Sequence, residues 1–233
     1  MRRILLKLSG ESLKGDEGYG LSPQRLSEVA DEIAAIKDTQ IAIVVGGGNI
    51  FRGETGEKLG FDRVQGDTIG MLATIINSLA MATALKSRNL SVKVMSAFPM
   101  EQIAITYSPN RAVSFLEEGN IVIIGGGSGN AFFTTDTAAS LRALQIKADA
   151  IIKGTRVKGV FSGDPEMDSN AVFYDELDYD EVLNKRLKVM DQTSFTLCRD
   201  NNLPIVVFDF LKADNLRKLI NGEDIGTIIH SRR

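Results

Sequence analysis

The sequence predicts an α/β protein with three layers, in which helices cover both faces of a largely parallel central sheet. Short apolar runs alternate with helical patterns along the whole chain, which is the order that produces parallel sheets. Runs such as residues 121–124 are apolar throughout, as expected for strands buried on both faces. Two of these runs end in glycine-rich loops, which places a binding region at the sheet edge.

The first half of the chain predicts four strands and three helices. Residues 3–8, 41–45, 92–95 and 121–124 are rich in Ile, Val and Leu. Ser22 and Pro23 resemble an N-cap and first helical residue, and apolar residues then recur at helical spacing to residue 36. Glycine and charge predict a loop over 53–66, followed by a helix from Gly66 and Asp67 to residue 86. A shorter helix is expected over 110–116.

The second half continues the same alternation. Threonines and an aspartate lead into a helix expected over 138–146, and strands are predicted at 150–153, 205–208 and 227–229. Further helices are expected over 180–187, 191–201 and 215–220. Asp164 and Pro165 predict a turn.

Composition limits the classes of function. The chain has 233 residues, 43% hydrophobic and 24% charged, which is ordinary for a globular protein of one large or two small domains. A net charge of −3 gives no reason to expect nucleic acid, so an anionic ligand would have to meet local positive charge. Lys7 interrupts the first apolar run too early for a signal peptide, and no stretch is expected to span a membrane.

Histidine and cysteine are almost missing from the sequence. The single cysteine, Cys198, excludes an internal disulfide, fits a reducing cytosol, and is expected to be a small packing residue of a helix. The single histidine, His230, is expected at the surface near the C-terminus. Metal sites of the Cys/His type and Ser-His-Asp catalysis are therefore excluded, and no protein metal site is predicted.

Two strand–glycine–helix segments predict sites for phosphate. Residues 121–139 join a strand to glycines at 125–127 and 129, and then to Thr134, Thr135 and Asp136 at a helix start. A helix N-terminus offers N–H groups and partial positive charge to an anion. Residues 41–52 repeat the pattern, which predicts more than one phosphorylated group. The alternative is two ordinary strand-to-helix turns.

Individual charged residues add to this picture. Lys7 lies near the end of the first predicted strand, before Ser9 and Gly10, where its ammonium could reach a phosphate; the alternative is a solvated lysine at an edge. Lys153 likewise ends a predicted strand and is followed by Gly154 and Thr155. Arg52 could hold phosphate oxygens in a bidentate fork. Asp67 is either a ligand contact or a helix cap or first-turn carboxylate.

Familiar nucleotide motifs do not match. The P-loop pattern of glycine, four residues and Gly-Lys-Ser/Thr does not occur. The dinucleotide pattern fails at its last glycine, where Asn130 follows Gly129.

Several strings together resemble the bacterial uridylate kinase (UMP kinase) family, a branch of the amino acid kinase family. They are Lys-Leu-Ser-Gly at 7–10, Gly-Gly-Gly-Asn-Ile-Phe-Arg-Gly at 46–53, Arg-Val-Gln-Gly-Asp at 63–67, Gly-Asn-Ala-Phe-Phe-Thr-Thr-Asp at 129–136, Lys-Gly-Thr at 153–155 with Asp-Pro at 164–165, and Leu-Lys-Val-Met-Asp at 187–191. The resemblance runs nearly end to end. Ala131 replaces a frequent proline and Gly154 a frequent alanine, both at loop positions.

The resemblance implies a single domain of the amino acid kinase fold over 1–233, with an acceptor-nucleotide lobe near 1–145 and an ATP lobe near 146–233. It implies transfer of the γ-phosphoryl group from ATP to UMP with Mg²⁺, in pyrimidine nucleotide biosynthesis in the cytoplasm. It also implies a homohexamer activated by GTP and inhibited by UTP, with no membrane or nucleic-acid partner required.

The resemblance also implies roles for named residues. The catalytic set would be Lys7, Asp136 and Lys153. ATP would contact Lys7, Leu8, Ser9, Gly10, Gly48, Arg52, Thr155, Phe161 and Asp164. UMP would contact Gly47, Arg52, Asp67, Ser128, Gly129, Asn130, Ala131, Phe132, Phe133, Thr134 and Thr135. The ligand-responsive loop would be Gly15, Asp16, Glu17, Gly18, Tyr19 and Gly20.

Two other functions fit the same fold. An acetylglutamate or carbamate kinase would share the scaffold, but Asp67 and the Phe-Phe-Thr-Thr string at 132–135 argue against it. A binding or storage protein without catalysis could dispense with Lys7, Asp136 and Lys153, which are all present.

Overall fold

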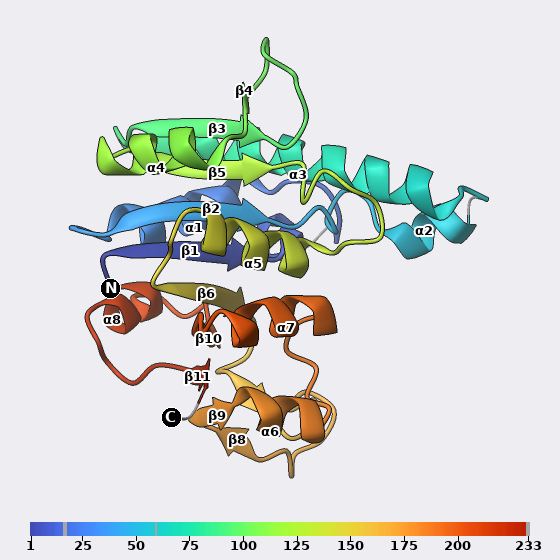
Figure 1. The fold of residues 1–233 in the computed structure, drawn as a ribbon, viewed down its shortest axis with the longest axis vertical. Coiled ribbons are helices and arrows are strands. Elements are labelled where there is room, and N and C mark those ends of the chain that lie inside the picture. Colours follow the sequence, from blue (N-terminus) through green and yellow to red (C-terminus); the bar gives the residue numbers. More distant parts are fainter. Residues whose placement is uncertain (16–17, 59, 232–233) are drawn as a thin grey trace.

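A computed structural model describes residues 1–15, 18–58 and 60–231, and nine strands of these residues form one sheet (Figure 1). The spatial order is β4-β3-β5-β2-β1-β6-β10-β11-β9. Neighbouring strands are parallel except for β10 and β11, which confirms the largely parallel sheet. The strands are β1 (Arg3–Leu8), β2 (Gln40–Val45), β3 (Val92–Ser96), β4 (Ile105–Thr106), β5 (Ile121–Gly125), β6 (Ala150–Thr155), β9 (Glu176–Asp178), β10 (Ile205–Asp209) and β11 (Thr227–His230).

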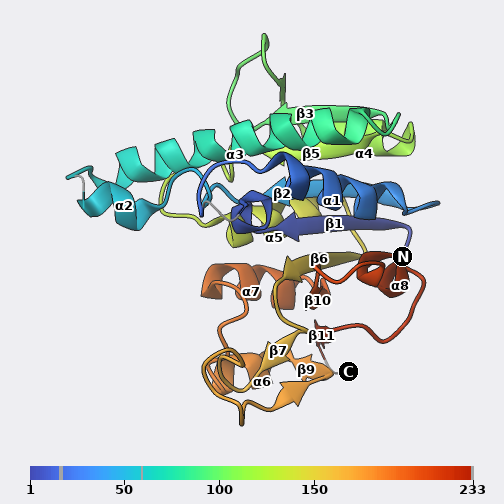
Figure 2. The ribbon, with the colours of Figure 1, turned by 180° about the vertical axis from the view of Figure 1, so that it is seen from behind.

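Helices cover both faces of the sheet, which confirms the three layers. Figure 1 shows α4, α5 and α7 in front of the strands, and Figure 2 shows α1 and α3 on the opposite side. A separate hairpin pairs β7 (Val160–Phe161) with β8 (Phe173–Tyr174). The helices are α1 (Pro23–Ala34), α2 (Gly53–Lys58), α3 (Arg63–Lys86), α4 (Pro109–Glu117), α5 (Thr135–Gln145), α6 (Tyr179–Asn184), α7 (Gln192–Asp200) and α8 (Asn215–Ile220), with a 3₁₀ turn, η1 (Gly10–Leu13).

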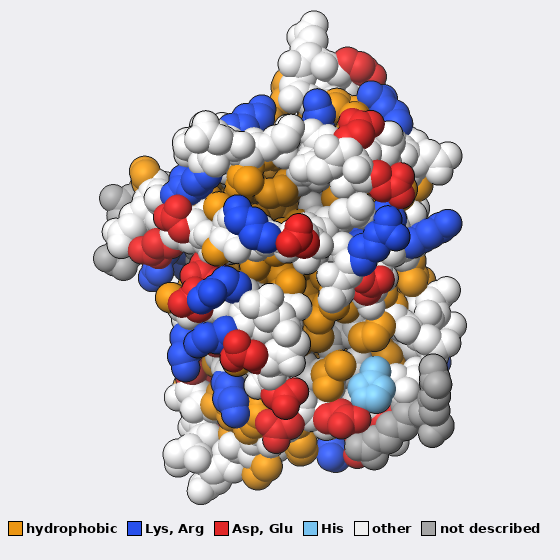
Figure 3. All heavy atoms as spheres, turned by 90° about the vertical axis from the view of Figure 1, so that its left-hand side faces the viewer, with side chains coloured by type: hydrophobic (Ala, Val, Ile, Leu, Met, Phe, Trp, Pro, Cys, Tyr) orange, Lys and Arg blue, Asp and Glu red, His pale blue; other side chains and the backbone are white. Residues whose placement is uncertain are grey.

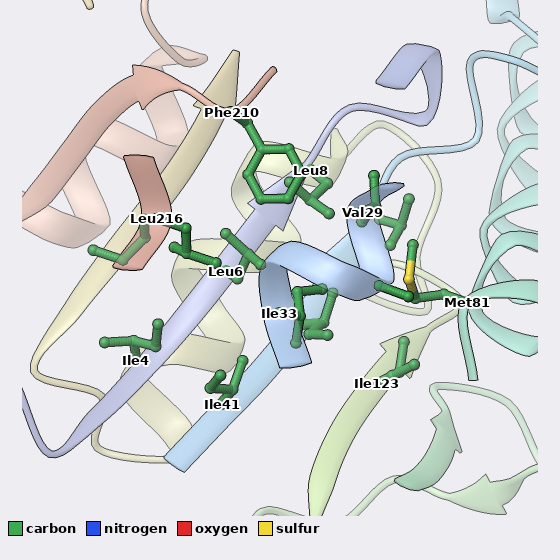
Figure 4. Close-up of a cluster of buried hydrophobic side chains, with 14 of the residues drawn as sticks. Ile4, Leu6, Leu8, Val29, Ile33, Ile41, Met81, Ile123, Phe210 and Leu216 are labelled. Atoms are coloured by element: carbon green, nitrogen blue, oxygen red, sulfur yellow. The ribbon is translucent and has the colours of Figure 1, made fainter. Parts of the chain in front are cut away.

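Each face of the sheet has its own apolar core. On one side, Ile4, Leu6 and Leu8 of β1 pack with Val29 and Ile33 of α1 (Figure 4). On the other side, Leu5 belongs to the cluster that includes residues of α4, α5 and α7. Because side chains alternate along a strand, Lys7 lies on the same face of β1 as Leu5. A lysine therefore occupies a position where the pattern would place an apolar residue.

Most predicted elements are confirmed, with shifted ends. The helix predicted over 138–146 begins earlier, at Thr135, because Thr134 is the N-cap. The helix predicted over 180–187 ends at Asn184. The short strands β4, β7, β8 and β9 were not predicted, because strands of two or three residues carry no measurable periodicity. Cys198 is buried, as predicted for a packing residue.

The prediction of a loop over 53–66 is wrong. This segment contains α2 and the first turn of α3. Asp62 is the N-cap of α3 and accepts a hydrogen bond from the Gln65 N–H at 3.0 Å. Glycine-rich composition concealed these helical turns. The interpretation of Asp67 as the helix cap is also wrong, because Asp67 lies more than a turn inside α3.

Helix α3 also corrects the expectation about membrane spans. Its 24 residues are long and apolar enough to cross a membrane by length and composition. However, much of the helix is buried within the protein, where α3 packs on β5 and α1. Its buried face also carries Asn77 and Ser78. These contacts are those of a core helix.

The amino ends of the parallel strands lie away from the glycine loops. Figure 3 shows this face, where Lys, Arg, Asp and Glu side chains of both signs are intermixed. His230 is the pale-blue residue there, half-buried, with its Nε2 2.7 Å from Glu176 Oε1. The site residues predicted from the sequence lie at the other end of the sheet, where the parallel strands have their carboxyl ends.

Candidate active site

Two lysines face the same space at the carboxyl ends of the central strands. Lys7 of β1 and Lys153 of β6 are direct partners in the parallel register. Neighbouring strands lie about 4.8 Å apart, so the two side chains emerge next to each other on the face covered by α5. Both are largely buried, with side-chain exposures of 10% and 13%.

Asp136 lies between the two ammonium groups. It is in the first turn of α5, and its Oδ1 lies 2.6 Å from Lys7 Nζ while its Oδ2 lies 2.9 Å from Lys153 Nζ. Lys153 also donates a hydrogen bond to the Val189 carbonyl. The three residues predicted as the catalytic set therefore form one cluster, with one more positive than negative charge.

Burial and charge act in opposite directions within this cluster. Burial by itself raises the pKa of the Asp136 carboxyl, but the charges of Lys7 and Lys153 outweigh it and hold that pKa below its usual range. Burial and the charge of Lys7 lower the pKa of the Lys153 ammonium, against the opposing effect of Asp136. The surplus cation is thus held where water screens it little, which favours an incoming anion.

The position of Asp136 is fixed from a second helix. Asp191 is the N-cap of α7 and accepts hydrogen bonds from the Ser194 N–H at 2.8 Å and the Thr137 N–H at 3.1 Å. The hydroxyl of Thr137 lies 2.9 Å from Asp191, and the Thr134 hydroxyl also donates to it. One carboxylate therefore joins the N-termini of α5 and α7.

The glycine loop after β2 packs directly against α3. A Cβ on Gly47 would lie 2.7 Å from the Gly70 carbonyl oxygen and 2.9 Å from the Ala73 Cβ. The same loop is held by Asn77, whose amide donates to the Gly46 carbonyl at 2.6 Å and to Asn49 Oδ1 at 2.7 Å. Only glycine fits at residue 47, and its backbone forms a wall of the neighbouring pocket.

A pocket of about 410 Å³, which we call pocket A, lies between the glycine loops and α3. Five residues predicted to contact UMP line it, together with Gly48, which was predicted for ATP. Its full lining is Gly47, Gly48, Phe51, Gly53, Arg63, Gly66, Asp67, Gly70, Met71, Thr74, Gly127, Phe133, Thr134 and Thr135.

A second pocket of about 580 Å³, pocket B, lies beside β6 and β7. Thr155, Phe161 and Asp164, all predicted to contact ATP, line it. So does Val189, the residue whose carbonyl accepts from Lys153. A third hollow of similar volume includes Asp136 and shares the 186–189 segment with pocket B. The lysine–aspartate cluster is thus connected to both predicted binding regions. Asp136 follows Thr135 of pocket A, and Lys153 contacts Val189 of pocket B.

Other predicted site residues are placed differently. Leu8 is fully buried in the core, so only its backbone could meet a ligand. Ser9 caps η1, Gly10 is buried, and Arg52 pairs with Glu11 and donates from Nε to the Gly48 carbonyl at 3.2 Å. Residues 128–132 do not line pocket A, although the Phe132 N–H donates to Asp67 Oδ2 at 2.7 Å.

The predicted ligand-responsive loop lies partly outside the described residues. Asp16 and Glu17 lie outside the described residues, whereas Gly15, Gly18, Tyr19 and Gly20 are described. The Gly20 N–H donates to the Asn49 carbonyl at 2.7 Å, which connects this loop to the glycine loop after β2. Tyr19 is 72% exposed.

Sequence reasoning missed several residues of the site. Asp191 and Val189 were within a recognised string but had no assigned role. The Thr74 hydroxyl accepts a hydrogen bond from the Gly126 N–H at 2.8 Å. No motif in the sequence indicated this role for Thr74. Asp191 could have been found, since an aspartate immediately before a helix is an expected N-cap.

Known proteins match nearly the whole of this chain in sequence. Residues 2–209 match the model of the amino acid kinase family. A uridylate kinase of Parabacteroides distasonis is 53% identical over 232 residues, covering 99% of this chain and 98% of that relative. A uridylate kinase of Bacteroides thetaiotaomicron has the same identity and coverage.

Solved structures give the same result. A UMP kinase from Bacillus anthracis superposes with a TM-score of 0.96 at 42% identity, covering 100% of this chain and 97% of that one. A UMP kinase from Ureaplasma parvum superposes with a TM-score of 0.94 at 34% identity, covering 99% of each chain.

We expect Asp136→Asn to lower the free energy of unfolding by about 3–5 kcal/mol at pH 7, because two buried ammonium groups lose their counter-ion. Asp31→Asn is the control: its pair with Arg88 is at the surface, so the loss should stay below about 1 kcal/mol. Urea unfolding measures both.

Urea unfolding at lower pH tests the direction in which the pKa of Asp136 is shifted. The pKa of Asp136 is depressed in the folded protein, so its contribution is complete above the ordinary carboxyl pKa of about 3.9. It is lost as the pH falls through the folded value. The gap between wild type and Asp136→Asn should therefore narrow below about pH 4. If this difference in free energy of unfolding is small at pH 7, or does not change with pH, Asp136 does not stabilise the protein through the two lysines.

Proposed function

The chain belongs to the amino acid kinase family, and we propose from this membership and from its lysine–aspartate–lysine cluster that it is a UMP kinase. The reaction is ATP + UMP → ADP + UDP, a step of pyrimidine nucleotide biosynthesis in the cytoplasm. The observation that carries the proposal is the cluster itself, in which two buried cations share one carboxylate. Asp136 follows Thr135, which lines pocket A, and Lys153 donates to the carbonyl of Val189, which lines pocket B. The names of relatives that are 53% identical over nearly the full chain supply the substrate.

The proposed chemistry needs charge neutralisation more than covalent catalysis. Phosphoryl transfer proceeds through a transition state with charge spread over the equatorial oxygens, so positioning and cations supply most of the rate. Lys7 and Lys153 would stabilise this charge, and Asp136 would hold both ammonium groups in place. A phosphate monoester has a second pKa of about 6, so the acceptor is already mostly a dianion and requires no general base.

We assign UMP to pocket A and ATP to pocket B. Pocket A belongs to the proposed acceptor lobe, residues 1–145, and is lined by backbone of two glycine loops and by the start of α5. Pocket B belongs to the proposed ATP lobe, residues 146–233, and is lined by Phe161 and by Arg186 and Lys188. An aromatic ring and two cations suit a purine nucleoside and its phosphates.

Mg²⁺ would arrive with ATP. Among the described residues, no three His, Cys, Asp or Glu side chains gather into a metal site. Both oxygens of Asp136 already face ammonium groups. Mg²⁺ commonly keeps several waters and binds through substrate phosphates, so the residues present fit an ion that the nucleotide itself carries.

ADP release with each nucleoside monophosphate tests the proposal. We expect UMP to support turnover well above CMP, AMP and GMP. Turnover with acetylglutamate or carbamate instead of UMP would identify a different kinase of the same family.

We expect Lys7→Ala to keep the fold but to lower kcat by on the order of a hundredfold or more, because one transition-state charge partner is lost. Lys37→Ala is the control, since Lys37 is exposed and remote from the cluster. A coupled ADP assay measures both. Turnover of Lys7→Ala within about threefold of wild type would refute the assigned role.

Asp67 is proposed to bind the ribose of UMP. It lines pocket A, and its Oδ2 already accepts from Arg63 Nε at 2.8 Å and from the Phe132 N–H at 2.7 Å. A carboxylate has capacity for further hydrogen bonds, so a ribose hydroxyl could bind without displacing either donor. Asp67 would then connect the nucleotide to both α3 and the 128–134 loop.

We expect wild type to prefer UMP over dUMP by roughly ten- to a hundredfold, since hydrogen bonds to charged groups contribute about 1.5–3 kcal/mol each. Asp67→Ala should remove much of this preference. Asp62→Ala is the matched control, because Asp62 is the true cap of α3 and its loss should lower Tm while leaving the UMP/dUMP ratio intact. An unchanged ratio in Asp67→Ala would exclude the ribose contact.

We further propose a homohexamer that GTP activates and UTP inhibits, as the resemblance implies. One surface supports self-association. Val64, Leu72 and Ile76 of α3 are 50%, 44% and 49% exposed and recur at multiples of four residues, so they form an apolar stripe along one side of the helix. A second copy of this chain is the proposed occupant.

We expect a double substitution of Leu72→Glu and Ile76→Glu to reduce the mass measured by sedimentation, because charge would be buried in the contact. Lys37→Glu, at an exposed position outside α3, should leave the mass unchanged. An oligomer that survives the double substitution would place the interface elsewhere.

A further inference from the structure

Arg142 occupies a core position of α5 without a carboxylate partner. It follows Ala138 and Ala139 by four and three residues and is only 6% exposed. No ion pair to Arg142 is found within the described part of the chain. A buried charge without a counter-ion is costly, so compensating contacts are required.

Those contacts join Arg142 to the wall of pocket A. Its Nη2 donates to the Gly127 carbonyl at 3.1 Å and lies 3.4 Å from the Ser128 carbonyl oxygen, while its Nη1 donates to Gln145 Oε1 at 2.9 Å. Gly127 lines pocket A. The guanidinium therefore holds the glycine loop from the side of α5.

The ring of Tyr107 covers the guanidinium. The Arg142 Cζ lies 4.1 Å from the ring centroid, within the range of a strong cation–π contact. The Tyr107 hydroxyl is buried without a hydrogen-bond partner among the described residues, as is the Arg142 Nε. Burial raises the pKa of this hydroxyl and the charge of Arg142 opposes that effect, so the hydroxyl and the guanidinium also interact.

The loop that Arg142 holds depends on such support. Gly127 has φ of +61°, a left-handed conformation. Glycine adopts positive and negative φ about equally well, so contacts with other residues must select this conformation. Thr74 holds the neighbouring Gly126 N–H from the α3 side at 2.8 Å. Because a peptide unit is planar, fixing the Gly127 carbonyl also fixes the Ser128 N–H.

We propose that Arg142, stacked on Tyr107, is a positioning residue that sets the shape of pocket A and thereby the affinity for the acceptor nucleotide. This inference rests on the proposed function only in naming UMP as the ligand of pocket A. It assigns Arg142 to the acceptor step and leaves phosphoryl transfer to the lysine–aspartate cluster.

The test replaces Arg142 by methionine, which has similar length but no charge. We expect KM for UMP to rise by roughly ten- to a hundredfold, the range set by one hydrogen bond to a charged group. KM for ATP should stay within about twofold. Tm should not fall appreciably, because removing an unpaired buried charge offsets the lost hydrogen bonds. Arg111→Met, at an exposed position of α4, should change none of these values.

Tyr107 provides a matched pair. Tyr107→Phe keeps the ring and should change KM for UMP less than Tyr107→Leu, which removes the π face and should raise KM for UMP severalfold. A large fall of Tm in Arg142→Met with both KM values unchanged would show a purely structural role and overturn the inference. Equal increases in both KM values would overturn it as well.

Calorimetric titration of UMP without ATP separates this inference from the proposed function. If wild type binds UMP but makes no UDP, the kinase proposal fails, while weaker binding by Arg142→Met still supports the positioning role. If Arg142→Met binds UMP as tightly as wild type, the positioning role fails and the kinase proposal stands. A wild type that does not bind UMP overturns both.

Discussion

The ion cluster of Asp136 with Lys7 and Lys153 is the constraint on which the rest of the site depends. A carboxylate can remain ionised in this buried position only because two ammonium groups contact it, and each lysine can remain there only because of the carboxylate. This mutual dependence requires β1 and β6 to be neighbours in register, and it requires α5 to begin directly above them. The fold and the proposed chemistry therefore share one set of contacts.

The sheet topology explains why the two pockets use the loops of different strands. The chain continues from β1 to β2 on one side, and later returns to place β6 on the other side of β1. In an open parallel sheet, such a reversal leaves a crevice at the carboxyl ends of the strands, where ligands bind. Pocket A uses the loops after β2 and β5, and pocket B uses the segment after β6. Lys7 and Lys153 belong to the two strands at the reversal.

Buried polar groups hold the loops of the site from behind. Asn77 fixes the loop after β2, Thr74 and Arg142 fix the loop after β5, and Asp191 fixes the start of α5. Each such group loses hydration when it is buried, and hydrogen bonds offset that loss. None of them belongs to the lysine–aspartate cluster, but together they determine where the backbone that faces a ligand lies. They are the support that a precisely positioned site requires.

The sequence by itself determined the fold class, most of the elements and the three charged residues of the cluster. The fold class and the elements follow from local signals, which are apolar runs and helical spacing. The grouping of Lys7, Asp136 and Lys153 follows from the family resemblance of the strings that contain them. Sequence alone misplaced the start of α3, because glycines at 53 and 56 obscured a short helix and Asp62 was not recognised as its cap. Only the tertiary structure decided which residues meet: the register of Lys7 with Lys153, the reach of Asp191 between two helices, and the contact of Arg142 with residues 127 and 128. The physical reason is that each of these contacts joins segments distant in sequence, so its distance is set by packing and strand order, which no local pattern specifies.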